Sequence, residues 1–262
     1  IKNNIFFYLL NIMNKLLLFD VDGTLVDSSY KISEEHGAIL NRLKENYDIG
    51  IVGGGKLDKI LNQLNNKVFF KHYFTECGSC YHINNNNNEL DLKNIYSKNI
   101  KEHPLYNHIN NLIKLSLKYI SEVNYTIVGH FIDIRGGLIY VSLIGMVAND
   151  DERKYFINID KEQNIRQNLI NLLNNECIKL NIHNDISICI GGSVGIAIYP
   201  TEYDKIQVLE HLNMYGIKNI YYFGDKYQKN GNDYKLINIL EDNGYKIDNI
   251  EDTYNILLKN FL

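Results

Sequence analysis

Short apolar runs alternate with amphipathic segments in the first and last parts of the chain. The run at residues 16–19 holds three leucines and a phenylalanine and stops at the polar turn Asp20-Val21-Asp22-Gly23, so we expect a short buried strand there. Strands that alternate with helices predict an α/β fold with a parallel sheet. By the same criteria we expect further strands at 47–55, 68–74, 219–223 and 244–249, and helices at 32–44, 57–64, 203–215, 234–242 and 253–261.

The pattern changes between residues 88 and 198. We expect mostly helix over 90–123 and again over 154–180, and antiparallel strands at 125–134 and 138–143 around the turn Arg135-Gly136-Gly137. Further strands are expected at 186–190 and 195–199. The sequence therefore predicts a three-layer α/β core at 13–87 and 199–262 that is interrupted by an inserted α+β cap domain at 88–198.

Two carboxylates follow the first predicted strand. Asp20 and Asp22 reach the sheet edge at which α/β proteins bind their ligands. Two acids so close together favour a cation between them, and oxygen ligands point to Mg²⁺. With that shielding, Asp20 can attack phosphorus and form an aspartyl phosphate, while Asp22 can exchange a proton with the alcohol. The alternative is a solvated Asp-Gly turn without chemistry.

A second acidic segment, GDKYQKNGND at 224–233, follows the strand predicted at 219–223. Asp225 stands at a strand end as Asp20 does, so parallel neighbouring strands would bring both carboxylates to one edge of the sheet. Asn232 and Asp233 add oxygen atoms that can bind the metal or orient its water. The alternative for this segment alone is a loop held by its own Asp and Asn side chains.

Several other residues are candidates for phosphate binding. A glycine turn at 53–55 precedes a predicted helix, so the backbone of Gly54 and Gly55 can approach a phosphate closely. Lys205 can balance the negative charge beside Asp20. Arg135 and Arg153, both in the predicted insert, can each form a bidentate pair with a phosphate. The alternative for the three cationic residues is a solvent-exposed position.

Composition excludes some classes of function. A net charge of −4 argues against a nucleic-acid-binding protein, and the apolar run at 1–12 is too short to span a membrane. Since no signal-peptide cleavage site is visible, we expect Met13 to be the true start, residues 1–12 to be a non-native or disordered extension, and the protein to be cytoplasmic. The four cysteines, Cys77 and Cys80 among them, are expected to be reduced structural thiols.

DVDGTL at 20–25 resembles the first motif of the haloacid dehalogenase superfamily of phosphotransferases. With IVGGG, HFIDIRGGLIYVSLIG, DDER, KEQNIR, YYFGDK, GND and EDT in this order, residues 13–262 resemble eukaryotic-type phosphomannomutases. The resemblance implies a haloacid-dehalogenase-like core with a cap, Mg²⁺, a hexose 1,6-bisphosphate activator and a homodimer formed through the caps. It also implies a sugar-phosphate substrate, with mannose 6-phosphate and mannose 1-phosphate interconverted in GDP-mannose biosynthesis.

Carried over by position, the resemblance implies roles for individual residues. Asp20 falls on the nucleophile, Asp22 on the general acid/base and Lys205 on the core lysine. Arg135 and Arg153 fall on two cap arginines that hold the distal phosphate, and Gly54 and Gly55 join them as substrate-binding residues. The expected metal-binding residues are Asp20, Asp22, Asp225, Asn232 and Asp233.

The chain departs from the family at positions that contact the substrate. Met146 and Ser29 replace two arginines, and Gly195 and Ala197 replace a serine and an aspartate that touch the sugar. Each lost charge-assisted contact removes roughly 1.5–3 kcal/mol of binding. The choice between mannose and glucose phosphate therefore stays open, and two alternatives remain: a Mg²⁺-dependent sugar-phosphate phosphatase and a non-catalytic paralogue.

Overall fold

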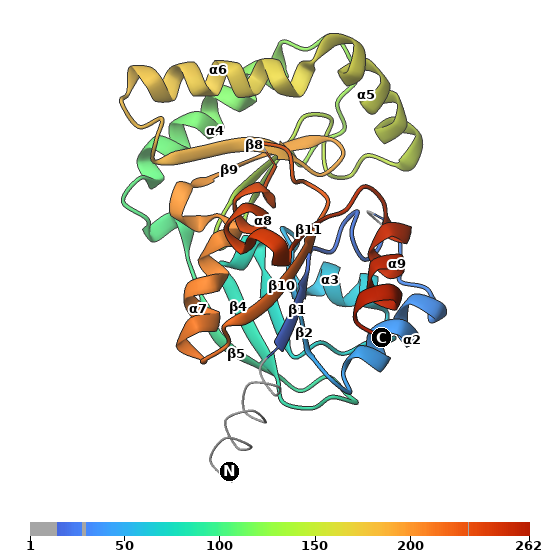
Figure 1. Ribbon diagram of the computed structural model, residues 1–262. Coiled ribbons are helices and arrows are strands. Elements are labelled where there is room, and N and C mark those ends of the chain that lie inside the picture. Colours follow the sequence, from blue (N-terminus) through green and yellow to red (C-terminus); the bar gives the residue numbers. More distant parts are fainter. Residues whose placement is uncertain (1–14, 28–29, 230) are drawn as a thin grey trace, which may run out of the picture. The chain divides into compact units, whose positions relative to one another are not determined.

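The computed structural model describes residues 15–27, 30–229 and 231–262, which Figure 1 traces. The extension expected at residues 1–12 and position Ser29 lie outside the described residues. The chain forms two compact units: one runs to Ser97 and resumes at Lys205, and the other spans Lys98–Asp204. Each unit has its own sheet and its own hydrophobic core.

The first unit is built on a seven-stranded sheet with the order β11-β10-β1-β2-β3-β4-β5. Strands β11 to β3 pair parallel, whereas β4 and β5 join the sheet antiparallel. The mostly parallel sheet confirms the predicted fold class. The strand bounds are β1 Lys15–Phe19, β2 Asp48–Val52, β3 His72–Thr75, β4 Cys80–Asn84, β5 Leu92–Ser97, β10 Asn219–Gly224 and β11 Gly244–Lys246.

Helices cover both faces of this sheet (Figure 1). On one face α2 (Glu34–Leu43), α3 (Leu57–Leu64) and α9 (Ile250–Asn260) pack in one apolar cluster with Leu17 and Phe19 of β1. On the other face α7 (Val208–Met214) and α8 (Tyr234–Leu240) pack with Leu16 and Leu18. Alternate residues of a strand point to opposite faces, so burial on both faces explains why residues 16–19 are all apolar.

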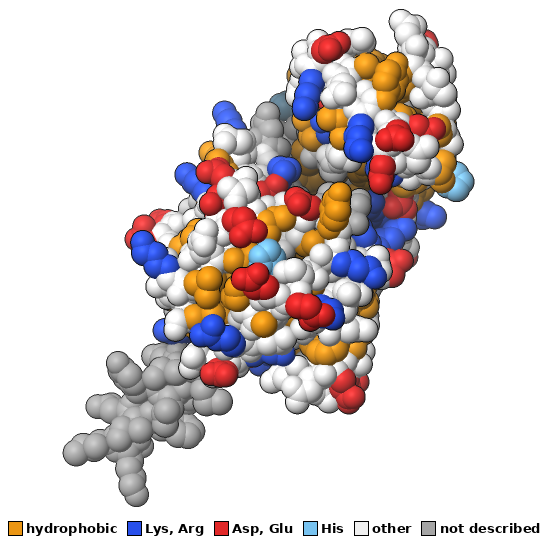
Figure 2. Space-filling view, turned by 90° about the vertical axis from the view of Figure 1, so that its right-hand side faces the viewer, with side chains coloured by type: hydrophobic (Ala, Val, Ile, Leu, Met, Phe, Trp, Pro, Cys, Tyr) orange, Lys and Arg blue, Asp and Glu red, His pale blue; other side chains and the backbone are white. Residues whose placement is uncertain are grey.

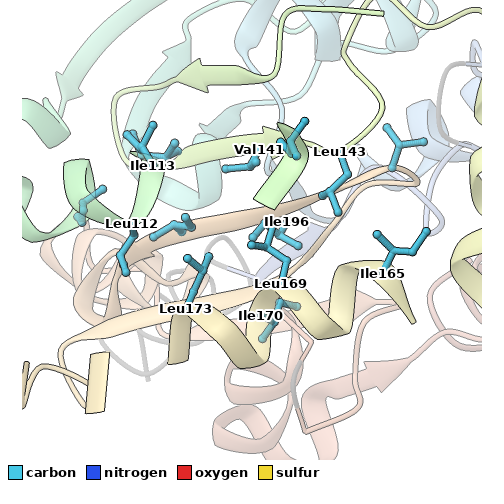
Figure 3. Packing of buried hydrophobic residues seen from close by; sticks show 14 of the residues in the cluster. Leu112, Ile113, Val141, Leu143, Ile165, Leu169, Ile170, Leu173 and Ile196 are labelled. Carbon is cyan, nitrogen blue, oxygen red and sulfur yellow. The ribbon is translucent and has the colours of Figure 1, made fainter. Parts of the chain in front are cut away.

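The second unit holds a four-stranded antiparallel sheet with the order β6-β7-β9-β8. Its strands are β6 Ile132–Ile134, β7 Ile139–Ser142, β8 Ile186–Gly191 and β9 Gly195–Pro200, and its helices are α4 Tyr106–Ser121, α5 Asp150–Gln163 and α6 Ile165–Lys179. Leu112 of α4 and Leu169 of α6 pack against Val141 and Ile196 of the sheet (Figure 3). An antiparallel sheet with helices packed on one face matches the expected α+β character.

The remaining short elements are 3-10 turns. They are η1 Glu76–Gly78, η2 Ile100–Glu102, η3 Thr201–Tyr203, η4 Lys205–Gln207 and η5 Glu241–Asn243.

Some local expectations were wrong. Residues 92–97, expected to be helical, form strand β5, and α4 begins only at Tyr106. The apolar residues Leu92, Ile95 and Tyr96 have helical spacing, but the segment pairs with β4, and this tertiary pairing overrides the local pattern. The helix expected over 154–180 is two helices, because Asn164 adopts a left-handed conformation with φ 53° between them.

The surface gives little indication of a partner. On the face shown in Figure 2, basic and acidic side chains are interspersed, as the small net charge of −4 leads one to expect. Among the described residues, no helix has the length and apolar character that crossing a membrane requires.

His72 makes the stability of the first unit depend on pH. The residue is 2% exposed and hydrogen-bonds Tyr81, and burial, with a smaller contribution from Lys71, lowers the pKa of His72 from 6.5 to about 3. Below pH 6.5 His72 therefore binds a proton in the unfolded chain but stays neutral in the folded chain, so the free energy of unfolding falls as the pH decreases toward 3.

We expect acidification from pH 7 to pH 5 to lower the free energy of unfolding of the wild type by about 2 kcal/mol more than that of His72→Asn. Urea denaturation at the two pH values measures this difference. An equal loss in both proteins would show that His72 does not carry the effect.

Candidate active site

Two acidic residues meet at the edge of the seven-stranded sheet. β1 and β10 are parallel neighbours with Phe19 opposite Phe223, and the amide of Asp20 donates to the Phe223 carbonyl at 2.9 Å. Asp225 follows β10 at the same edge. Gly23 has φ +92°, and a Cβ on it would lie 2.5 Å from Asp225 Oδ2. The turn after β1 can pass this close to Asp225 only because residue 23 is glycine.

The C-terminal helix fixes the backbone that follows this turn. The Thr253 hydroxyl donates to the Thr24 carbonyl at 2.8 Å, and the Tyr254 hydroxyl donates to the Leu25 carbonyl at 3.0 Å. Helix α9 therefore holds the loop on which Asp22 lies.

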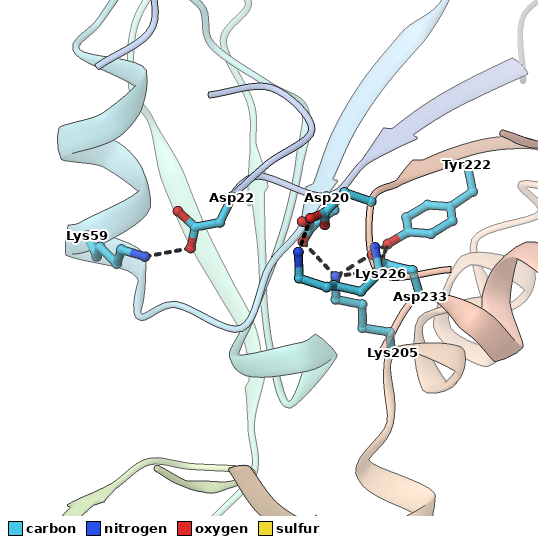
Figure 4. Close-up of polar contacts among 8 residues, drawn as sticks. Asp20, Asp22, Lys59, Lys205, Tyr222, Lys226 and Asp233 are labelled. Carbon is cyan, nitrogen blue, oxygen red and sulfur yellow. Dashed lines mark hydrogen bonds and ion pairs between the residues drawn. The ribbon is translucent and has the colours of Figure 1, made fainter. Parts of the chain in front are cut away.

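Lys205 joins the acidic residues. Its side chain is fully buried, and Nζ donates to Asp20 Oδ1 and to Asp233 Oδ1, each at 2.6 Å (Figure 4). Asp233 is held from two further sides, because the Tyr222 hydroxyl donates to its Oδ1 and the Lys226 amide donates to its Oδ2 at 2.9 Å. Asp233 thereby orients Lys205 toward Asp20.

Burial controls the ionisation of these groups. It raises the pKa of Asp20 to about 8; Lys205 opposes this shift, and Asp233 and Asp225 add to it. Burial also raises the pKa of Asp225, against the opposing effect of Lys226. Burial lowers the pKa of Lys205, but Asp20 and Asp233 outweigh it and hold that pKa well above its usual value. One fully buried ammonium, Lys205, and the more exposed Lys226 thus face three carboxylates, so acidic groups outnumber basic groups in this cluster.

The donor set fits a hard divalent cation. One oxygen from each of Asp20, Asp225 and Asp233 lies within 4.8 Å of the others. Oxygen ligands of one octahedral Mg²⁺, each about 2.1 Å from the ion, lie about 3 to 4 Å apart, so these three atoms are near the spacing that one ion requires. Within the described part of the chain, Asp225 Oδ1 and Asn232 Oδ1 are buried without a hydrogen-bond partner, which a metal ligand or its water would explain.

Asp22 lies in a separate network. Its Oδ2 accepts from Lys59 Nζ at 2.6 Å and its Oδ1 from Gln63 Nε2 at 2.7 Å, so its carboxylate points away from Asp20 (Figure 4). The three-acid group does not include this carboxylate. The metal-binding role expected of Asp22 stays a prediction.

Sequence reasoning missed Lys59, Gln63 and Tyr222. Lys59 and Gln63 are four residues apart on α3 and so share one helix face, a spacing that follows directly on the glycine turn and could have indicated them. Tyr222 lies two residues after Ile220 and therefore shares its face of β10. This pattern predicts the side of the sheet on which the ring lies, but not the contact of its hydroxyl with Asp233.

The glycine turn lies between β2 and α3. The Gly55 carbonyl accepts from the Glu76 amide at 3.1 Å, and the Gly53 carbonyl accepts from the Cys77 amide at 2.9 Å. Glu76 and Cys77 themselves have positive φ values of 53° and 58°. The turn is therefore held in a defined conformation at the start of α3, while substrate contacts of Gly54 and Gly55 stay a prediction.

Arg135 and Arg153 belong to the second unit. Arg135 Nε donates to Asp133 Oδ2 at 2.8 Å. Arg153 donates to two carbonyls, from Nε to Ala148 at 2.9 Å and from Nη2 to Met146 at 2.8 Å. Both guanidinium groups are fixed by acceptors within their own unit, and their phosphate-binding role stays a prediction.

Comparisons with known proteins cover most of the chain. Residues 37–262 match the family model described as eukaryotic phosphomannomutase, a match that starts after the acidic motif at Asp20. The chain is 33% identical to the phosphomannomutase of Saccharomyces cerevisiae, over 94% of this chain and 94% of that protein. It is 31% identical to the phosphomannomutase of Encephalitozoon cuniculi, over 91% of this chain and 90% of that protein.

Solved structures support the fold. The IMP-bound IMP-nucleotidase of Plasmodium falciparum superposes with a TM-score of 0.68 at 15% identity, covering 94% of this chain and 68% of that one. The C-terminal domain of the Candida albicans trehalose-6-phosphate phosphatase gives 0.55 at 14% identity, covering 87% and 73%. At these identities the likeness concerns the fold alone.

We expect Lys205→Met to lower the free energy of unfolding by about 3–5 kcal/mol, because it leaves two buried carboxylates without their cation. Urea denaturation in the presence of EDTA measures the loss. Lys226→Met is the matched control: the Lys226 side chain is 58% exposed beside Asp225, so its loss should cost less than about 1 kcal/mol. Similar losses in the two variants would contradict the role given to Lys205.

Proposed function

We propose that this chain, which belongs to the eukaryotic phosphomannomutase family, interconverts mannose 6-phosphate and mannose 1-phosphate through a phosphorylated Asp20. The observation that carries the proposal is the buried contact of Lys205 with Asp20 at 2.6 Å, at the strand edge that Asp225 shares. A lone carboxylate there would be a poor nucleophile, but one whose charge is balanced by a fixed ammonium can attack phosphorus.

In the proposed reaction the phosphoryl group moves from Asp20 to the free hydroxyl of a hexose monophosphate, and Asp22 takes the proton of that hydroxyl. The bisphosphate then returns its other phosphoryl group to Asp20 as the sugar–oxygen–phosphorus bond breaks, and Asp22 gives the proton back to the leaving oxygen. Each half of the cycle forms one phosphorus–oxygen bond and breaks one.

Separate hydrogen-bond networks support separate roles for the two acids. Asp20 is buried, which raises its pKa, and the contact with Lys205 opposes that shift and so favours the charged form that acts as the nucleophile. Asp22 is held by Lys59 and Gln63 on α3, away from the three-acid group. We propose that this second network positions Asp22 for proton transfer, so Lys59 and Gln63 are positioning residues.

Mg²⁺ would be held by Asp20 and Asp225, and Asn232 and Asp233 would add oxygen ligands or orient water bound to the ion. When bound, the ion would offset the excess of carboxylate charge and stabilise charge on the transferring phosphoryl group. Asp233 already accepts three hydrogen bonds, which supports an orienting role for it.

The proposal extends to partners and setting. Arg135 and Arg153 would bind the phosphate that is not being transferred, and a hexose 1,6-bisphosphate would prime Asp20. We also propose that the protein forms a homodimer through its second unit, which sedimentation tests. A cytoplasmic location is the last part of the proposal, and cell fractionation tests it.

A coupled assay tests the function. Purified protein is incubated with mannose 1-phosphate and Mg²⁺, with and without glucose 1,6-bisphosphate, and both mannose 6-phosphate and inorganic phosphate are measured. Formation of mannose 6-phosphate that depends on the bisphosphate supports the proposal. Release of phosphate alone would indicate a phosphatase, and no turnover with any hexose phosphate would favour a non-catalytic protein.

We expect Asp20→Asn to abolish phosphoenzyme formation and to reduce turnover by at least about a thousandfold, because it removes the carboxylate proposed to accept the phosphoryl group. Intact-mass spectrometry after incubation with acetyl phosphate and Mg²⁺ detects the adduct. Asp22→Asn is the control: acetate leaves without a proton, so this variant should still be phosphorylated, yet it should lose about 10²–10⁴-fold in mutase turnover. A phosphorylated Asp20→Asn protein would refute the nucleophile assignment.

We expect Asp225→Asn to weaken Mg²⁺ binding by at least about tenfold, because one charged oxygen ligand is lost from the cluster. Isothermal titration with Mg²⁺ measures the affinity, and the Mg²⁺-dependent rise in melting temperature gives a second readout. Asp58→Asn, which removes the same charge from an exposed position on α3, should leave the affinity unchanged. Equal affinities for wild type and Asp225→Asn would exclude Asp225 as a ligand.

A further inference from the structure

A tyrosine lies on the face of the second unit's sheet that does not carry the core. Ile139 and Val141 of β7 and Ile196 and Ile198 of β9 belong to the apolar cluster with α4 and α6. Tyr140 lies between Ile139 and Val141 in β7, so its side chain points to the opposite face. In register, Tyr140 stands opposite Asp133 of β6 and Ala197 of β9, and Ala197 stands opposite Cys189 of β8.

Arg135 lies against the ring of Tyr140, and three arginines influence the ionisation of its phenol. The Arg135 guanidinium carbon lies 5.1 Å from the ring centroid. Burial raises the pKa of the Tyr140 phenol, and the positive charges of Arg135, Arg153 and Arg166 oppose this shift. The phenol is therefore protonated at neutral pH and can donate a hydrogen bond, and it lies beside the ion pair of Arg135 with Asp133.

The ring occupies space that glycines leave open. A Cβ on Gly195 would lie 2.6 Å from both Cζ and the hydroxyl oxygen of Tyr140, and a Cβ on Gly192 would lie 3.2 Å from that oxygen. A Cβ on Gly195 would also lie 2.4 Å from the Val141 carbonyl oxygen, so both the strand backbone and the phenol require glycine at this position. The Tyr140 hydroxyl thus brings a polar group next to Gly195, whereas Gly195 and Ala197 offer no polar side-chain atoms.

We propose that Tyr140 is a specificity-determining residue whose hydroxyl hydrogen-bonds the sugar phosphate held by Arg135 and Arg153. This inference rests on the proposed function, because it takes those arginines as phosphate ligands. A phenol can donate to a phosphate oxygen or accept from a sugar hydroxyl, and its ring offers an apolar surface to the C–H groups of a sugar. It would therefore supply recognition on a face where residues 195 and 197 supply none.

Tyr140→Phe tests the inference with little disturbance, because it removes one oxygen and keeps the ring. We expect the KM for mannose 1-phosphate to rise about tenfold while kcat stays within about twofold, because the contact is made with the bound substrate before and during transfer. Tyr125→Phe is the matched control: the Tyr125 hydroxyl donates to the Leu143 carbonyl at 3.1 Å, so its loss should lower the melting temperature and leave KM unchanged.

The possible failures are distinguishable. If the wild type forms mannose 6-phosphate and Tyr140→Phe keeps the wild-type KM, the role of Tyr140 is overturned and the proposed function stands. If the wild type shows no mutase turnover, the proposed function fails, and calorimetric titration with mannose 1-phosphate decides about Tyr140. An affinity about tenfold weaker in Tyr140→Phe then supports the inference, whereas an unchanged affinity, or no binding to the wild type, overturns it.

Discussion

The site depends on the burial of one ammonium group between two carboxylates. Lys205 is fully buried and reaches Asp20, 185 positions earlier in the chain, and Asp233, 28 positions later. Removing three charged groups from water is costly, and only close ion pairs with additional hydrogen bonds offset that cost. The Tyr222 hydroxyl and the Lys226 amide provide these bonds to Asp233. The same buried contacts therefore stabilise this edge of the sheet and bring the groups of the candidate site together.

This arrangement gives two neighbouring acids different environments. Asp20 is 6% exposed and shares its charge environment with Asp225, Asp233 and Lys205, whereas Asp22 contacts Lys59 and Gln63 on a helix. Two carboxylates that differ in burial and partners can take different parts in one reaction, one as nucleophile and the other as proton carrier. Only one residue separates them in sequence, and the turn at Gly23 makes the difference possible.

The sequence was most informative where local pattern and chemistry coincide. The apolar run at 16–19 and the acids after it predicted both the strand and the site edge, and the segment after residue 223 predicted Asp225 and Asp233 in the same cluster. Strand β5 could not be predicted, because its helical spacing is overruled by pairing with β4. Tyr222 and Tyr140 escaped notice for a different reason: a tyrosine in a strand is ordinarily part of the apolar packing, and the contacts of Tyr222 with Asp233 and of Tyr140 with Arg135 arise only in the folded chain.

The hydrogen bonds from Thr253 and Tyr254 to the carbonyls of Thr24 and Leu25 have a consequence for the order in which the site can form. Each bond joins residues 229 positions apart, so the loop that carries Asp22 gains these anchors only when α9 has docked. The pairing of β1 with β10 does not use these bonds. Loss of α9 should therefore free this loop while the neighbouring strands still pair.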